Sequence, residues 1–180
     1  AAGRSPGARA YTQGEITTMT ARAKKQHWVF RVHVADRAGA LTSIASAFSN
    51  RGISIETVVG HGASHSPAAD GTVIATVWCT EMEKDEIVRI VKRLSKVLSL
   101  EEHPYDSDSL RKSALVHVTQ RLTPKDVAGR ETFLTCELMQ EGRGDFTYFL
   151  AGSPSELDPV LARLKRRGLI ADMVYSVLGI

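Results

Sequence analysis

The chain has 180 residues, of which 43% are hydrophobic and 24% are charged, and its formal net charge is +3. This is an ordinary globular composition, with room for one medium domain or two small ones. The nearly balanced charge argues against nucleic-acid binding. No apolar run approaches the roughly 20 residues that span a bilayer.

Residues 1–26 form a segment of small, polar and basic residues in which Glu15 is the single acid. This composition, without apolar periodicity, predicts a disordered N-terminal segment. Two alternatives stay open: a targeting-peptide remnant and a basic arm that touches a partner. We therefore expect a cytoplasmic protein if the source is prokaryotic, and an organellar one if the segment is a transit-peptide remnant.

A strand, a glycine turn and a helix open the first unit. Hydrophobic residues alternate from Trp28 to Val34, which predicts a strand with one buried face. After Gly39 the period changes to that of a helix with one apolar stripe, formed by Leu41, Ile44, Ala45 and Phe48. Gly52 is placed to end this helix, and strand chemistry resumes at Ile53.

The turn Asp36–Gly39 is the strongest candidate for a binding site. The first N–H groups of a helix have no intrahelical partner and can receive an anion such as an amino-acid carboxylate. Gly39 lacks a Cβ and allows a close approach. The alternative is purely structural, with Asp36 capping the helix and Gly39 making the turn.

The rest of the first unit continues the same alternation of elements. Residues 60–71 are predicted to form a loop, in which His61 and His65 lack the third ligand of a metal site. Residues 72–79 are predicted to form a strand that is covered on both faces. Thr80 and Glu83 form a capping-box pattern. The helix that follows has an apolar stripe and a solvated face, the latter made of Lys84, Asp85, Arg89, Lys92 and Arg93. A strand over 97–102 completes a βαββαβ unit.

A second βαββαβ unit follows a linker. We expect a first domain over 27–104, a linker over 105–111 and a second domain over 112–180, which makes an α+β protein of two tandem ferredoxin-like units. A capping box at Ser153–Glu156 starts the last helix, unless Pro159 is its first residue. Cys79 and Cys136 are each predicted to be small buried residues, and a bridge between them stays an alternative.

The pattern Asp36-x-x-Gly39-x-Leu41, followed by Ile44-Ala45, Phe48 and Arg51-Gly-Ile-Ser-Ile-Glu56, resembles the opening of an ACT domain, an amino-acid-sensing βαββαβ module. Residues 49–56 are most similar to the small regulatory subunits of acetolactate synthase (acetohydroxyacid synthase). The likeness covers residues 28–178 and is most specific in 32–59.

This resemblance implies a non-catalytic regulatory subunit. It would bind and activate the catalytic subunit of acetolactate synthase and confer feedback inhibition by a branched-chain amino acid, with valine expected. Thiamine diphosphate, FAD and Mg would belong to the catalytic partner, so no cofactor or metal is expected here. The resemblance also implies a homodimer through the ACT domain, with neither nucleic acid nor membrane as a partner.

The resemblance places the effector between two ACT domains, at the glycine turn of one chain and the start of the second strand of the other. The corresponding effector-binding residues are Asp36, Arg37, Ala38, Gly39, Ala40, Leu41, Ser54 and Ile55. Asp36 and Ser54 stand where asparagines are usual in these subunits. An ionised Asp36 would repel an effector carboxylate but would hold an ammonium group.

Two other classes of function are weighed against this reading. A free-standing ACT-domain sensor, acting on another enzyme or a transcription system, fits the acidic Asp36 turn but accounts less well for the second unit. An independent enzyme is disfavoured because none of the six histidines forms a familiar motif with a serine or cysteine nucleophile. We therefore predict no catalytic residues.

Overall fold

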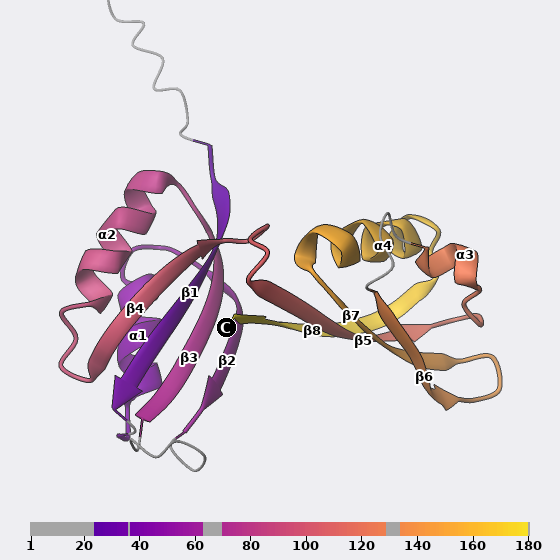
Figure 1. The fold of residues 1–180 in the computed structure, drawn as a ribbon, viewed down its shortest axis with the longest axis horizontal. Coiled ribbons are helices and arrows are strands. Elements are labelled where there is room, and N and C mark those ends of the chain that lie inside the picture. Colours follow the sequence, from indigo (N-terminus) through magenta and orange to yellow (C-terminus); the bar gives the residue numbers. More distant parts are fainter. Residues whose placement is uncertain (1–23, 36, 63–69, 129–133, 180) are drawn as a thin grey trace, which may run out of the picture.

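The structure is a computed structural model that describes residues 24–35, 37–62, 70–128 and 134–179. It contains two four-stranded antiparallel sheets, each with its own helices, in the order β-α-β-β-α-β repeated twice (Figure 1). The predicted α+β class and tandem ferredoxin-like plan are confirmed. Most of the predicted disordered segment, Asp36 and His65 lie outside the described residues.

The N-terminal unit has the sheet order β2-β3-β1-β4, so β2 and β4 are its edge strands. Its elements are β1 (Gln26–Ala35), α1 (Ala40–Ser49), β2 (Ile55–His61), β3 (Asp70–Cys79), α2 (Glu81–Val91) and β4 (Val97–Pro104). β1 pairs with both β3 and β4, and β2 pairs with β3. The chain therefore leaves β1 through the Gly39 turn and returns along α1 before it enters β2.

The C-terminal unit repeats this topology with the sheet order β6-β7-β5-β8. Its elements are β5 (Leu110–Val118), α3 (Pro124–Val127), β6 (Thr135–Glu141), β7 (Phe146–Gly152), α4 (Pro154–Arg166) and β8 (Ile170–Gly179). Leu110 and Arg111, predicted to lie in the linker, are instead the first residues of β5. α4 begins at Pro154 and contains Pro159, as the capping-box reading predicts. None of the described helices is long and apolar enough to cross a membrane.

The hydrophobic patterns account for both cores except on α1, where Leu41 of the predicted stripe is 47% exposed and Ala40 and Ala47 are buried instead. In the N-terminal unit Phe30 and Phe48 are fully buried, and their rings meet edge to face with centroids 5.4 Å apart. The Thr80 hydroxyl accepts a hydrogen bond from Glu83 N–H (3.3 Å), and the Glu83 carboxylate accepts one from Thr80 N–H (2.7 Å), so the predicted capping box is present. In the C-terminal unit the predicted α4 stripe is buried, comprising Leu157, Val160, Leu161 and Leu164.

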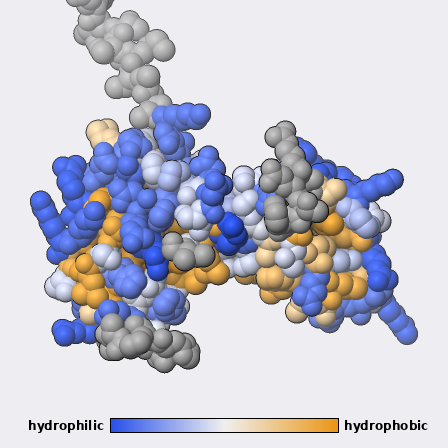
Figure 2. Space-filling model, viewed as in Figure 1, coloured by the Kyte–Doolittle hydropathy of each residue, from blue (hydrophilic) through white to orange (hydrophobic). Residues whose placement is uncertain are grey.

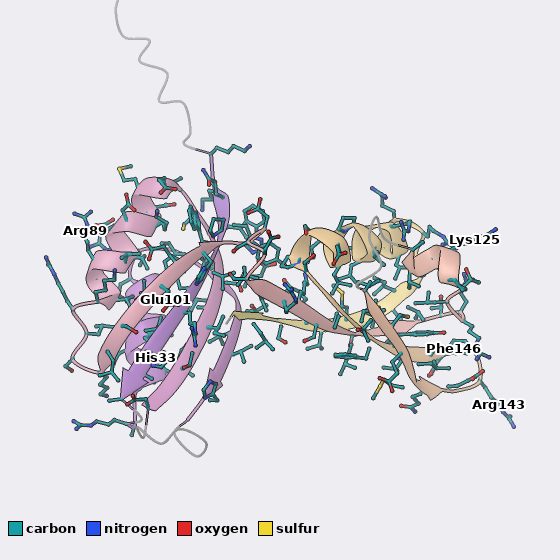
Figure 3. The ribbon with its side chains drawn as sticks, in the orientation of Figure 1. His33, Arg89, Glu101, Lys125, Arg143 and Phe146 are labelled. Atoms are coloured by element: carbon teal, nitrogen blue, oxygen red, sulfur yellow. The ribbon has the colours of Figure 1, made fainter. Side chains whose placement is uncertain are left out.

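Each sheet has one face that its own helices do not cover. Figure 3 shows His33 on β1 and Glu101 on β4 projecting from that face of the N-terminal sheet. In the C-terminal unit, Leu115 on β5 and its cross-strand neighbour Val174 on β8 are 48% and 68% exposed. Figure 2 shows hydrophobic side chains in this unit, whereas hydrophilic side chains surround α2 in the other unit.

Three further side chains depart from the sequence-based expectations. Val29, expected on the open face of β1, is fully buried because the C-terminal unit packs against that end of the sheet. Lys84, expected in solvent, is 8% exposed; its ammonium lies 4.5 Å from the Trp28 ring and 3.2 Å from Asp85. Cys136, expected to be buried, is exposed because β6 is an edge strand, while Cys79 is buried, and both thiols are free.

Candidate functional site

The turn between β1 and α1 adopts the conformation for which glycine is suited. Gly39 precedes the helix with φ 79°, in the left-handed region that other residues rarely adopt. The Gly39 carbonyl accepts from Ser43 N–H (3.0 Å) and from the Ser43 hydroxyl (2.9 Å). Within the described residues no side chain caps the helix. Ala40 N–H donates to the Arg37 carbonyl (3.1 Å), so the N–H groups that follow it in the first turn are the ones that an anion can meet.

Lys96 reaches this turn from a distant part of the chain. Its backbone carbonyl accepts from Ala35 N–H (2.9 Å), and its ammonium donates to the Ala38 carbonyl (2.7 Å), 58 positions away in sequence. A Cβ added at Gly39 would lie 3.1 Å from Lys96 Nζ. The turn therefore holds a positive charge beside the helix N-terminus, and glycine is the residue that leaves space for it.

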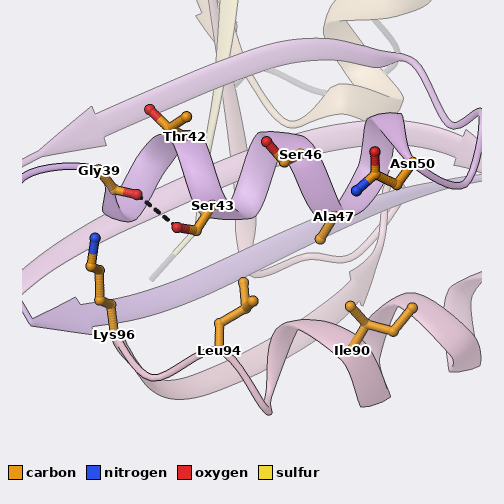
Figure 4. A pocket seen from close by; sticks show the side chains of 9 residues that line it. All are labelled: Gly39, Thr42, Ser43, Ser46, Ala47, Asn50, Ile90, Leu94 and Lys96. Carbon is orange, nitrogen blue, oxygen red and sulfur yellow. Dashed lines mark hydrogen bonds between the residues drawn. The ribbon is translucent and has the colours of Figure 1, made fainter.

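A groove runs from this turn along the gap between α1 and α2 (Figure 4). Its volume is about 550 Å³, and it is open to solvent along its length. One wall is the hydroxyl- and amide-bearing side of α1, and the other is formed by the end of α2 and its connection to β4. The lining residues are Gly39, Thr42, Ser43, Ser46, Ala47, Asn50, Ile90, Leu94 and Lys96. Arg51, which follows α1, forms an ion pair with Glu86 on α2.

The predicted effector residues of the turn differ in their accessibility. Arg37, Ala38 and Gly39 are exposed, and Leu41 is 47% exposed. Ala40 is buried in the core, so its side chain is directed away from any ligand at the turn. The equivalent connection in the C-terminal unit, residues 119–123, contains no glycine, which leaves the N-terminal turn as the better anion site.

Ser54 and Ile55 lie at the opposite end of α1 from Gly39. Ser54 is exposed immediately before β2, and Ile55 is the first residue of β2, where it pairs with Val77 and packs against the core. The 10-residue α1 helix separates the two sets, which corresponds to about 15 Å at the helical rise. A single copy of the chain therefore does not bring the two predicted halves of the site together.

Lys96 and the α1–α2 groove are the parts of this site that sequence reasoning missed. A lysine between a predicted helix and a predicted strand is usually an ordinary surface residue, so its position alone does not indicate a binding site. The local sequence around Lys96 carries no signal for its hydrogen bond to Ala38, because that contact depends on how β4 pairs with β1.

Comparison with known proteins gives weak sequence similarity and clear structural similarity. No family model matches the chain. The acetolactate synthase small subunit of Mycolicibacterium smegmatis is 22% identical over 139 residues, which cover 77% of this chain and 81% of that protein. The crystal structure of the acetolactate synthase small subunit from Thermotoga maritima matches with a TM-score of 0.63 and 14% identity, covering 86% of this chain and 96% of that one.

The regulatory subunit of aspartate kinase from Thermus thermophilus is a more distant structural match, with a TM-score of 0.42 and 15% identity over 78% of this chain and 89% of that one. The Thermotoga match extends through both units and covers nearly the whole of the matched chain. In sequence and in fold, this chain thus resembles the small subunits of acetolactate synthase.

Proposed function

We propose that this protein is a regulatory subunit that binds and activates the catalytic subunit of acetolactate synthase and makes it sensitive to a branched-chain amino acid. The observation that carries the proposal is the similarity to acetolactate synthase small subunits along both units. In this reading the chain has no catalytic role. Thiamine diphosphate, FAD and Mg belong to the partner, and valine is the expected effector.

The chemistry of the Gly39 turn suits the carboxylate of such an effector. The N-terminal end of α1 and the Lys96 ammonium both favour a negative charge, and the missing Cβ of Gly39 allows close approach. Lys96 would also offset the like-charge repulsion expected from Asp36, which in turn would receive the effector ammonium. The aspartate at position 36, where asparagine is usual in these subunits, would then change the orientation of the amino acid without removing the site.

A homodimer through β2 would complete the site. β2 is an edge strand parallel to β1, so it ends near the turn and begins at the other end of the sheet. When two β2 edges pair antiparallel, the start of one lies beside the end of the other. Ser54 and Ile55 of one copy would then approach the Gly39 turn of its partner, and Leu41 and Val58, both 47% exposed, would be covered.

A charge placed on this edge is expected to prevent dimerisation. Val58→Asp introduces a carboxylate that would be buried next to its own copy across the two-fold axis, and we expect the dimer dissociation constant to rise by about 100-fold or more. Leu98→Asp on the opposite edge strand β4 is the matched control, because Leu98 is also exposed, at 56%. Sedimentation velocity at micromolar concentration should show a monomer for Val58→Asp and a dimer for Leu98→Asp. The reverse pattern would place the interface on β4.

The decisive test is the activity of the acetolactate synthase catalytic subunit from the same source, with and without this protein. We expect activation that valine, leucine or isoleucine reverses. Activation without inhibition would support the proposed catalytic partner but would show that the proposed effector is wrong. The absence of both activation and a complex would reject the proposed function and favour a free-standing ACT-domain sensor, the alternative that the acidic Asp36 supports.

A further inference from the structure

A cluster of polar and aromatic side chains joins the two units, and neither the turn nor the groove uses it. Tyr105 and Lys112 are its buried members, whereas Trp78 is 50% exposed. We call this cluster the junction; it comprises His27, Glu56, Trp78, Tyr105, Lys112, Asp158 and Tyr175. It lies over a small separate core to which both units contribute, made of Val29, Ile74, Tyr105, Leu110 and Val177. Strand β8 thereby packs on β2 and β3.

His27 forms the N-terminal side of the junction. Its ring is stacked between Trp78, with centroids 4.2 Å apart, and Tyr105, with centroids 3.6 Å apart. Its Nε2 lies 2.7 Å from the Glu56 carboxylate. Burial lowers the pKa of His27 below its ordinary value, and Glu56 opposes this shift. The imidazole is thus held in one orientation with its ring edge towards Glu56.

Lys112 and Tyr175 form the C-terminal side. The Lys112 ammonium donates to Asp158 (2.6 Å) and to the Tyr105 hydroxyl (3.0 Å), and it lies 3.9 Å from the centre of the Tyr175 ring. Only 6% of the Lys112 side chain is exposed, so its position is closely determined. Burial raises the pKa of Tyr175, whose hydroxyl keeps its proton and donates to Glu56.

Glu56 connects this cluster to the candidate effector site. It follows Ile55 directly, and the β2–β3 register shifts between Ile55 and Thr57, which makes Glu56 the extra residue of a β-bulge. A bulge redirects a side chain and ends regular pairing. Here it turns Glu56 towards His27 and Tyr175, so that one carboxylate at the start of β2 is held by side chains from both units.

We propose that Tyr175 and Glu56 are positioning residues of the effector site: the C-terminal unit holds the start of β2, and with it Ser54 and Ile55, in the conformation that receives the amino acid. The proposal rests on the proposed function for the identity of the ligand. The second unit then takes a direct part in amino-acid sensing. If the Tyr175–Glu56 contact raises the affinity for the ligand, bound ligand must strengthen that contact by the same factor.

The test compares two tyrosine-to-phenylalanine variants of the full chain. Tyr175→Phe removes only the hydroxyl that donates to Glu56. Tyr148→Phe removes a hydroxyl of the same unit that accepts from Leu122 N–H (3.1 Å). Tyr148 lies on β7, which β5 separates from β8, so this variant controls for general destabilisation of the C-terminal unit. Valine affinity is measured by calorimetry, and amide hydrogen exchange of residues 53–60 is measured by mass spectrometry without ligand.

We expect Tyr175→Phe to weaken valine binding by about fivefold or more and to speed exchange in residues 53–60, and Tyr148→Phe to change neither. Glu56→Gln, whose amide oxygen still accepts from Tyr175, should retain most of the affinity, whereas Glu56→Ala should not. Wild-type affinity and exchange in Tyr175→Phe would overturn the proposal. If the wild-type chain binds no branched-chain amino acid, the proposed effector is wrong. In that case unchanged exchange of residues 53–60 in Tyr175→Phe would by itself overturn the positioning role.

Discussion

Gly39→Asp is expected to abolish the response to branched-chain amino acids while the complex with the catalytic subunit still forms. The new side chain would begin 3.1 Å from Lys96 Nζ and would place its own carboxylate against that ammonium. It would thus occupy the position proposed for the effector carboxylate and repel a second one. We expect valine affinity to fall by about 100-fold or more, which is the loss of roughly 2.7 kcal/mol.

Gly144→Asp is the matched control for this change. Gly144 also has a positive φ, of 84°, but nothing lies within 4 Å of the Cβ that an aspartate would add there. It therefore carries the same change in charge and a similar backbone cost without touching the turn. Calorimetry with valine and co-purification with the catalytic subunit check both variants. Normal inhibition in the Gly39→Asp complex would remove the turn from the effector site.

Phe48→Ala is expected to destabilise the N-terminal unit by about 3–5 kcal/mol, which is a large part of the stability of a small domain. Phe48 is fully buried and packs edge to face on Phe30, so truncation leaves a cavity under α1. Because α1 carries the Gly39 turn at its start, effector affinity should fall as well. Urea unfolding followed by tryptophan fluorescence measures the loss, since Trp28 and Trp78 both lie in this unit.

Met82→Ala on α2 is the control for Phe48→Ala. Met82 is 74% exposed, so its truncation removes few packing contacts and is expected to change the free energy of unfolding by less than about 1 kcal/mol. Both proteins are compared at one concentration, because any dimer makes the transition depend on it. Equal effects of the two truncations would mean that α1 is not held through Phe48.

The elements of the fold could be predicted because their signals are local. Alternation from Trp28 to Val34, the α4 stripe and the Thr80–Glu83 capping box each depend on residues a few positions apart, and each is present in the structure. The burial of Val29 and Tyr105 could not be predicted in this way. Those residues are covered by the other unit, and the contact depends on how two distant segments pack.

The candidate site was predictable to a similar extent. The positive φ of Gly39 follows from a glycine between a strand and a helix, and the structure has it. Lys96 was missed because its contact with Ala38 depends on strand pairing across the sheet. Ser54 and Ile55 were singled out through a family resemblance, and their distance from Gly39 within one chain became visible only with the position of α1. Their role in binding remains a prediction.

The contrast between the two cysteines makes the distance between the units measurable in the native chain. Burial raises the pKa of the Cys79 thiol to about 11 and hides it from reagents, whereas Cys136 lies exposed on β6. A maleimide dye would therefore label the C-terminal unit alone. With both tryptophans in the N-terminal unit as energy-transfer donors, a rearrangement of one unit against the other during an amino-acid titration can be followed without any substitution.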